Sequence, residues 1–289
     1  MSKQVLMIDS QILNMYQECG TKFYYNFIMN VRPLFKPEAF DKGDLLHHML
    51  KFHYKMLRHN QIVKTDINKG KLISYNEIIQ ICVKKAQSHM LGLDLDVDLG
   101  LEVIKTYESY ARYYTNESWQ ILEVERPFAR VLFESDDIKI VYCGIIDLLT
   151  HVCIADHKSS SRRGNISALS NQFMGYAWAF NLYNVVINKI GFQKTLKPEE
   201  KYERQTMSYS TANINEWINN TTRTAIALYE DLQRIQELMN KRNFTACDKY
   251  SGCVFQNICA ANPDAREFII NKDYKIGDPW LPVKGLSVK

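Results

Sequence analysis

Two carboxylates and a lysine lie at the ends of two neighbouring apolar segments. Asp147 ends the run Val-Tyr-Cys-Gly-Ile-Ile-Asp, and Asp156 and Lys158 end the run Val-Cys-Ile-Ala-Asp-His-Lys that follows it. Charged side chains are rarely buried unless they are paired or bind a metal ion. Their position beside isoleucine, valine and cysteine therefore indicates chemistry.

The spacing of these residues predicts how they come together. Side chains two apart in a strand share a face, so Asp156 and Lys158 lie side by side while His157 points away. The short segment 148–151 is compatible with a hairpin that brings Asp147 toward them. Two carboxylates and a backbone carbonyl then form a partial oxygen cage that suits Mg²⁺, with Lys158 placed to orient a water molecule or offset charge.

Polar residues that follow the second strand could contact a substrate. Gln172 and Tyr176 are one helical turn apart, so an amide and a phenol share one face. The loop that holds Ser160, Arg162 and Arg163 offers hydroxyl and guanidinium donors for phosphate oxygens, although an ordinary surface loop has the same composition.

A single Asp-x-Lys occurs often by chance, but the order of three motifs is more specific. Gly-Ile-Ile-Asp at 144–147, Asp-His-Lys at 156–158 and Gln-Phe-Met-Gly-Tyr at 172–176 together resemble the PD-(D/E)xK nuclease superfamily. The RecB-like exonuclease branch is the most similar. The resemblance implies a restriction-endonuclease-like α/β core and hydrolysis of phosphodiester bonds with Mg²⁺ or Mn²⁺.

The same resemblance implies two further site residues. His47 follows Gly43 in an early helix and matches a metal-binding histidine of the branch, with His48 as the neighbouring alternative. Glu125 matches an acidic residue ahead of the first strand, with Glu123 as the alternative.

Seven cysteines, with no long apolar region at the N-terminus, predict a reducing, intracellular (cytoplasmic) setting without disulfides. Cys247, Cys253 and Cys259 are regularly spaced after a long helix, where thiolates could converge. Resemblance to AddB-type and CRISPR-associated nucleases implies that Cys19 joins them around a 4Fe-4S cluster. Four thiolates could equally hold tetrahedral zinc. The other three, at 82, 143 and 153, are predicted to be small core residues.

Composition gives broader limits. The net charge of +4 permits nucleic-acid binding without requiring it, and 46% hydrophobic residues support a substantial core. The sequence contains no run of about 18 apolar residues, so no membrane span is predicted. No Gly-x-x-x-x-Gly-Lys-Ser/Thr loop is present, so the protein would act alone or with a partner helicase or recombination protein.

Apolar periodicity predicts an α/β core with an N-terminal helical part. The resemblance implies that this core has a mixed central sheet flanked by helices and that the C-terminus is stapled by cysteines. Expected helices are 42–58, 74–90, 98–116, 167–182 and 211–242, and expected strands lie within 119–158, 185–192 and 205–210. Ser10 is expected to cap the first helix. The last thirty residues are expected to be irregular. Three regions, 1–118, 119–242 and 243–289, are predicted to form one compact unit.

These patterns predict a DNA exonuclease or end-processing nuclease for single-stranded or frayed ends, in recombination, repair or replication. One alternative is a non-catalytic DNA-binding or assembly subunit that keeps the fold. Another is a zinc-stapled structural protein in which Asp-x-Lys is incidental.

Overall fold

The computed structural model describes residues 3–34, 38–93, 95–160, 166–193, 195–248 and 252–281. The chain divides into two compact units, named here for their place in the sequence. The middle unit comprises Pro37–Pro127 and Ile145–Ser210, and the terminal unit comprises Met1–Lys36, Phe128–Gly144 and Thr211–Lys289. Strands β3 (Ile121–Glu134) and β4 (Ile138–Thr150) each run from one unit into the other. The three regions expected from the sequence stay a prediction.

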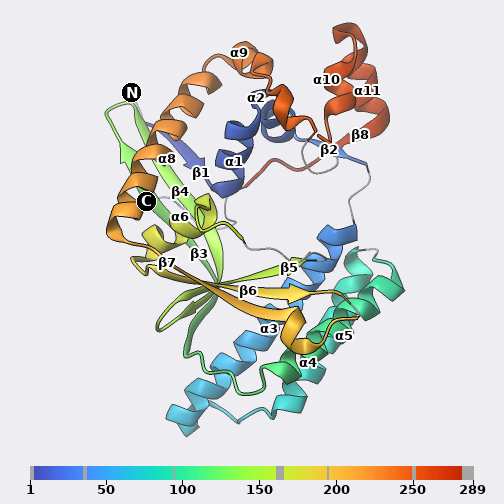
Figure 1. Ribbon diagram of the computed structural model, residues 1–289, viewed down its shortest axis with the longest axis vertical. Coiled ribbons are helices and arrows are strands. Elements are labelled where there is room, and N and C mark those ends of the chain that lie inside the picture. Colours follow the sequence, from blue (N-terminus) through green and yellow to red (C-terminus); the bar gives the residue numbers. More distant parts are fainter. Residues whose placement is uncertain are drawn as a thin grey trace. The chain divides into compact units, whose positions relative to one another are not determined.

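Three helices of the middle unit pack around one apolar core (Figure 1). They are α3 (Glu38–Thr65), α4 (Tyr75–Leu93) and α5 (Val97–Tyr113), with a short turn η2 (Ile67–Lys69) after α3. The buried residues of α5 recur at helical spacing: Gly100, Val103, Ile104, Tyr107, Tyr110 and Ala111. One face of this helix therefore joins the core.

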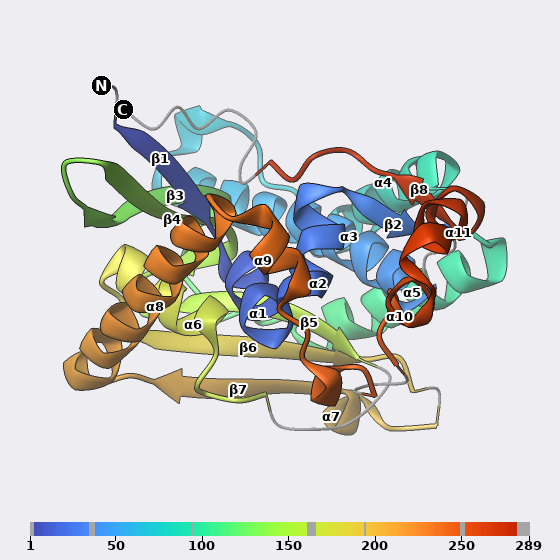
Figure 2. The same ribbon diagram turned by 90° about the horizontal axis from the view of Figure 1, so that it is seen from above.

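The middle unit also contains strands β5 (Ile154–Ser160), β6 (Asn184–Gly191) and β7 (Tyr202–Ser208). Helices α6 (Asn171–Phe180) and α7 (Pro198–Lys201) precede β6 and β7. β5 pairs with β4 in antiparallel and with β6 in parallel orientation, and β6 pairs with β7 in antiparallel orientation (Figure 2). The strand order is β1-β4-β5-β6-β7, with β3 also paired to β4. The predicted mixed sheet is confirmed.

The predicted hairpin between β4 and β5 is confirmed as well. Leu148 pairs with Ala155 and Leu149 with Ile154. Thr150 closes the turn, because its Oγ1 accepts from the Cys153 N–H at 3.0 Å and donates to the Cys153 carbonyl at 2.8 Å.

Alternate side chains of β5 point to opposite faces of the sheet, as the strand period requires. Ala155 belongs to the core formed with α3, α4 and α5, and the His157 ring stacks on a tyrosine of α3. Asp156 and Lys158 point to the other face, where α6 contacts both side chains. Helices therefore flank this part of the sheet on both faces.

The terminal unit combines both ends of the chain. Its elements are β1 (Gln4–Ile8), α1 (Ser10–Glu18), α2 (Gly20–Phe23), the π-helical turn η1 (Tyr24–Ile28), β2 (Val31–Pro33), α8 (Thr211–Leu232), α9 (Ile235–Asn240), η3 (Phe244–Ala246), α10 (Gln256–Ala260), η5 (Pro263–Ala265), α11 (Arg266–Asp273) and β8 (Tyr274–Ile276). β1 pairs in parallel with the start of β4, and β2 pairs in antiparallel orientation with β8.

The structure corrects four expectations. Asp9 caps α1 in place of Ser10, because the Asp9 carboxylate accepts from the Ile12 N–H at 2.8 Å. The long helix α8 ends at Leu232 and not near 242. The N-terminal strand β1 was not expected. The C-terminal segment is also not irregular throughout, since Tyr274 of β8 packs against Phe255 after the helix α11.

Candidate active site

The Asp147 side chain, on β4, forms a hydrogen bond with the main chain of β5. Leu148 of β4 pairs with Ala155 of β5. Next to this pair, the Asp147 Oδ2 atom accepts from the main-chain N–H of His157 at 2.7 Å. The Nδ1 atom of His47, on α3, lies 3.6 Å from the same oxygen. Continuing the register by one residue places Asp147 opposite Asp156.

Asp156 lies deeper than its partners. Its side chain is 2% exposed, whereas the side chain of Lys158 is 35% exposed. The Lys158 Nζ atom lies 2.7 Å from Asp156 Oδ2, and Gln172 Nε2 donates to Oδ1 at 3.2 Å. Apart from the ion pair, Oδ2 makes no hydrogen bond of good geometry to any described residue. Solvent therefore reaches the Lys158 side chain, whereas the Asp156 carboxylate that it contacts is buried.

The pKa values of the two carboxyl groups are shifted in opposite directions. Burial, and then the charge of Asp147, raise the pKa of Asp156 to about 6, against the opposing effect of Lys158. Burial also acts to raise the pKa of Asp147, but the hydrogen bond from His47 and the electrostatic effects of the neighbouring histidines outweigh it and lower that pKa to about 2. Carboxylates whose environments push their pKa values apart are typical of functional sites.

The pKa of His47 is raised, although its burial acts in the opposite direction. The hydrogen bond to Asp147 and the charges of Asp147 and Asp156 outweigh the cost of burial. The neighbouring alternative, His48, stacks instead on His89, with ring centroids 4.0 Å apart. Of the two histidines, His47 is therefore the one that contacts an active-site aspartate.

Helix α6 places Gln172 beside the Asp156 carboxylate and Tyr176 beside Gln172. Gln172 Nε2 donates to Tyr176 Oη at 2.8 Å, and this hydroxyl donates to the Ile145 carbonyl at 3.0 Å. Gln172 thus connects Asp156 to a tyrosine anchored on β4. Lys158 Nζ lies 5.7 Å above the ring of Phe173, an aromatic contact that the sequence analysis missed.

Glu125 contacts a lysine of α3. Its Oε2 atom lies 3.3 Å from Lys51 Nζ, and its backbone has φ of 54°, which is unusual for a residue other than glycine. Lys51 is four residues after His47, so the two side chains share a face of α3. That spacing could have identified Lys51 from the sequence. The alternative, Glu123, forms an ion pair with Arg126.

Arg162 and Arg163, predicted to contact nucleic acid, lie outside the described residues. Ser160 ends β5, and its side chain is likewise outside the description.

The four predicted cluster cysteines line one cavity of about 240 Å³ in the terminal unit: Cys19, Cys247, Cys253 and Cys259. The Cys253 N–H donates to the Cys247 carbonyl at 2.8 Å, next to Gly252 with φ of 103°, a conformation that suits glycine. Burial, and then the neighbouring cysteines, raise the pKa of Cys247. The remaining cysteines, at 82, 143 and 153, are buried as predicted.

Within the described part of the chain, no three His, Cys, Asp or Glu side chains are arranged closely enough to hold a metal ion. The four thiols thus surround a cavity without converging on one point, and His47, Asp147 and Asp156 do not form a ready three-residue cage. Among the described helices, none is both long and apolar enough to cross a membrane.

A mixed sheet with two carboxylates and a lysine on adjacent strands, flanked by helices, defines an α/β protein of the nuclease type. The chain belongs to the PD-(D/E)XK nuclease superfamily, whose sequence profile matches residues 11–260. No curated protein matches the chain significantly.

Two solved structures are similar at low identity. A candidate exonuclease from Eubacterium rectale is 10% identical, with 84% of this chain and 86% of that chain covered and a TM-score of 0.43. The protein SSO0001 is 15% identical, with 76% of this chain and 95% of that chain covered and a TM-score of 0.34. At these scores the likenesses say nothing about substrate.

Proposed function

We propose that this protein is a Mg²⁺- or Mn²⁺-dependent nuclease that hydrolyses phosphodiester bonds in DNA from an end, with single-stranded or frayed ends as substrate. The observation that carries the proposal is the buried carboxylate of Asp156, 2.7 Å from Lys158 and on the strand that is fastened to Asp147. Membership of a nuclease superfamily supports it.

The residues present fit a hard divalent cation. The charge of Asp147 contributes to raising the pKa of Asp156, which shows that the two carboxylates repel each other. A positive ion bound between them would reduce this repulsion. Mg²⁺ commonly uses one or two carboxylates and completes its shell with water and substrate phosphate, so a complete protein cage is not needed. Asp147 and Asp156 would hold the ion, joined by His47.

When bound, such an ion polarises the scissile phosphate and lowers the pKa of a water molecule. Lys158, whose side chain is partly exposed, would orient that water or offset charge on the phosphate. Gln172 holds Asp156, and Tyr176 holds Gln172. Glu125 would support the shell around the metal, with Lys51 holding its carboxylate.

Ser160, Arg162 and Arg163 would contact phosphate oxygens of the DNA, because these residues follow Lys158 within five positions of the sequence. The chain would work alone or beside a partner helicase in recombination, repair or replication.

For the cysteine cavity we propose a 4Fe-4S cluster held by Cys19, Cys247, Cys253 and Cys259, with zinc as the alternative. All four side chains face one cavity of about 240 Å³, which is roomier than the shell of a single tetrahedral ion with bonds of about 2.3 Å. Since no three His, Cys, Asp or Glu side chains of the described chain converge on one point, neither a zinc site nor a cluster site is preformed.

The test of the exonuclease proposal compares linear with circular single-stranded DNA of the same sequence, in Mg²⁺, in Mn²⁺ and in EDTA. Metal-dependent loss of the linear form alone is expected. Equal loss of circular DNA would replace the exonuclease by an endonuclease, and binding without cleavage under every metal would favour a non-catalytic subunit.

A further inference from the structure

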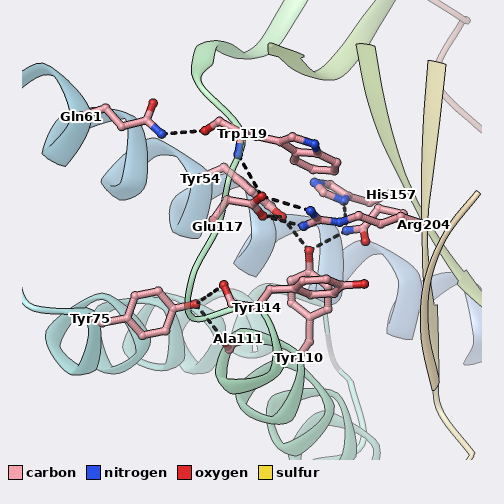
Figure 3. A network of polar contacts seen from close by, with 11 residues as sticks. Tyr54, Gln61, Tyr75, Tyr110, Ala111, Tyr114, Glu117, Trp119, His157 and Arg204 are labelled. Atoms are coloured by element: carbon pink, nitrogen blue, oxygen red, sulfur yellow. Dashed lines mark hydrogen bonds and ion pairs between the residues drawn. The ribbon is translucent and has the colours of Figure 1, made fainter. Parts of the chain in front are cut away.

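A buried polar network lies behind the strand that carries Asp156 and Lys158, on the opposite face of the sheet (Figure 3). It runs through helices α3 and α5, strands β5, β6 and β7, and the segment before β3. Its members are Tyr54, Tyr110, Glu117, His157, Asn188 and Arg204.

One end of the network is a partly buried ion pair. The Arg204 guanidinium donates to both carboxylate oxygens of Glu117, at 3.1 and 2.5 Å. It also lies between two aromatic rings, 3.7 Å from the ring centroid of Trp119 and 4.0 Å from that of Tyr114. Both oxygens of Glu117 therefore accept hydrogen bonds from the guanidinium.

That acceptor sets the direction of every following bond. Tyr54 Oη, 3.2 Å from Glu117, must donate to it. Tyr110 Oη, 2.6 Å from Tyr54, must then donate to Tyr54, because the Tyr54 proton is already used. Asn188 Nδ2 donates in turn to Tyr110 at 2.7 Å. The same amide nitrogen lies 2.8 Å from His157 Nδ1, which must therefore be an acceptor without a proton.

This direction has a cost that is visible in the structure. The Oδ1 atom of Asn188 is buried and has no hydrogen-bond partner among the residues that the structure describes. Rotating the amide by half a turn would move this oxygen toward Tyr110, whose proton is committed to Tyr54. Since nearly all buried polar groups are paired, an orphaned carbonyl oxygen indicates that the network imposes the orientation of Asn188.

The end of the network is attached to the active site through one residue. His157 lies between Asp156 and Lys158 in the chain, and its main-chain N–H holds the Asp147 carboxylate at 2.7 Å. Its ring is fixed on the other face of the sheet, stacked on Tyr54 with centroids 5.1 Å apart. Fixing the ring thus fixes the peptide that aligns all three active-site residues.

We propose that Asn188 is a positioning residue: by donating to the Nδ1 atom of His157, it fixes the rotation of the β5 segment that presents Asp156 and Lys158 and binds Asp147. The kinetic consequence rests on the proposed nuclease function. The tautomer of His157 does not, so the two claims can fail separately.

The first measurement is the ¹⁵N spectrum of the histidines in the intact protein, with His157 assigned by its replacement with glutamine. The expected result is a neutral ring that carries its proton on Nε2. A proton on Nδ1 in the wild-type protein would overturn the proposal, whether or not the protein cleaves DNA.

The second measurement compares Asn188→Asp with Asn184→Asp, the same change on the same strand. Asn184 lies outside the network and accepts from Ser208 Oγ at 2.9 Å, which a carboxylate can also do. A carboxylate at 188 cannot donate, so the His157 proton should move to Nδ1. We expect kcat to fall about tenfold or more, because small displacements of catalytic groups are costly. KM for DNA should stay within about twofold.

Wild-type kcat in a folded Asn188→Asp protein would contradict the proposal. Should Asn188→Asp fail to fold, Tyr110→Phe is the second variant, because it removes the hydroxyl that orients the Asn188 amide and lets the amide oxygen turn toward His157. A His157 proton on Nδ1 and a lower kcat are then expected, and the wild-type tautomer with the wild-type kcat in folded Tyr110→Phe would contradict the proposal. Asn184→Asp should change neither the tautomer nor kcat.

Discussion

Asp156 illustrates at the scale of one residue how an active site costs stability. Its carboxyl has a pKa raised to about 6 by burial and by Asp147, whereas an unfolded chain would have a value near 3.8. The folded protein therefore binds more protons than the unfolded chain between those values. Its stability should rise as the pH falls through this window, and ionised Asp156 should destabilise the metal-free fold above it.

Asp156→Asn should accordingly raise the free energy of unfolding by about 2 kcal/mol at pH 8, and by clearly less at pH 5. Urea unfolding in EDTA at both values measures the difference. Asp136→Asn, at an exposed position, is the control and should have little effect. A less stable Asp156→Asn protein at pH 8 would show that ionised Asp156 does not destabilise the metal-free fold.

His53 should make the fold sensitive to acid. Burial lowers its pKa to about 3, below the usual value of 6.5, and its Nδ1 atom lies 2.9 Å from the Tyr107 hydroxyl. The unfolded state then binds the extra proton, so stability should fall as the pH drops from about 6.5 toward 3. The slope for one group is about 1.4 kcal/mol per pH unit.

His53→Gln should reduce the slope of unfolding free energy against pH by about 1.4 kcal/mol per pH unit, the contribution of one proton. Urea unfolding between pH 6.5 and 4.5 measures this slope. His151→Gln changes an exposed histidine and should leave the slope as it is. An unchanged slope in His53→Gln would mean that the ring is not held neutral in the folded state.

At the scale of elements, the sequence located the strands and helices that carry the site. The period of two placed Asp156 and Lys158 on one face, and the short polar connection at 148–151 predicted the hairpin. β1 was missed because its five residues pair with a strand more than a hundred residues away. The Arg204–Glu117 pair was missed for the same reason, since nothing local in either segment specifies its partner.

The N-cap of α5 offers a test of element stability, because this helix carries Tyr110 into the buried network. Asp96 accepts from the N–H groups of Asp98 and Leu99 at 2.9 and 3.1 Å. Asp96→Ala should lower the free energy of unfolding by about 1 kcal/mol, whereas Asp96→Ser, which keeps a capping oxygen, should lower it by much less. Equal losses in thermal unfolding of both variants would show that the cap bonds do not stabilise α5.

At the scale of the whole molecule, the sequence related Cys19 to cysteines more than two hundred residues later only through a family resemblance. The structure brings all four to one cavity of the terminal unit. Neither spacing nor packing specifies the metal proposed for this cavity, because thiolates bind both iron–sulfur clusters and zinc.

The cysteine cavity predicts a coloured protein. After anaerobic purification the wild type should contain iron and sulfide and absorb visible light, and Cys253→Ser should lose all three and unfold at a lower temperature. Cys82→Ser, at a buried cysteine outside the cavity, is the control for general damage. A colourless wild type with one zinc ion would replace the cluster by zinc, and a protein without bound metal would remove both assignments.

The most direct test of the central claim is degradation of end-labelled single-stranded DNA by the wild type, Asp156→Ala and Lys158→Ala, with and without Mg²⁺ or Mn²⁺. We expect metal-dependent cleavage by the wild type and a loss of about a hundredfold or more in each variant, as for a removed group that stabilises charge in the transition state. Visible absorbance should be unchanged if the cysteine cavity is intact. Cleavage at the wild-type rate by folded Lys158→Ala or Asp156→Ala would contradict the assignment of this site as the catalytic centre.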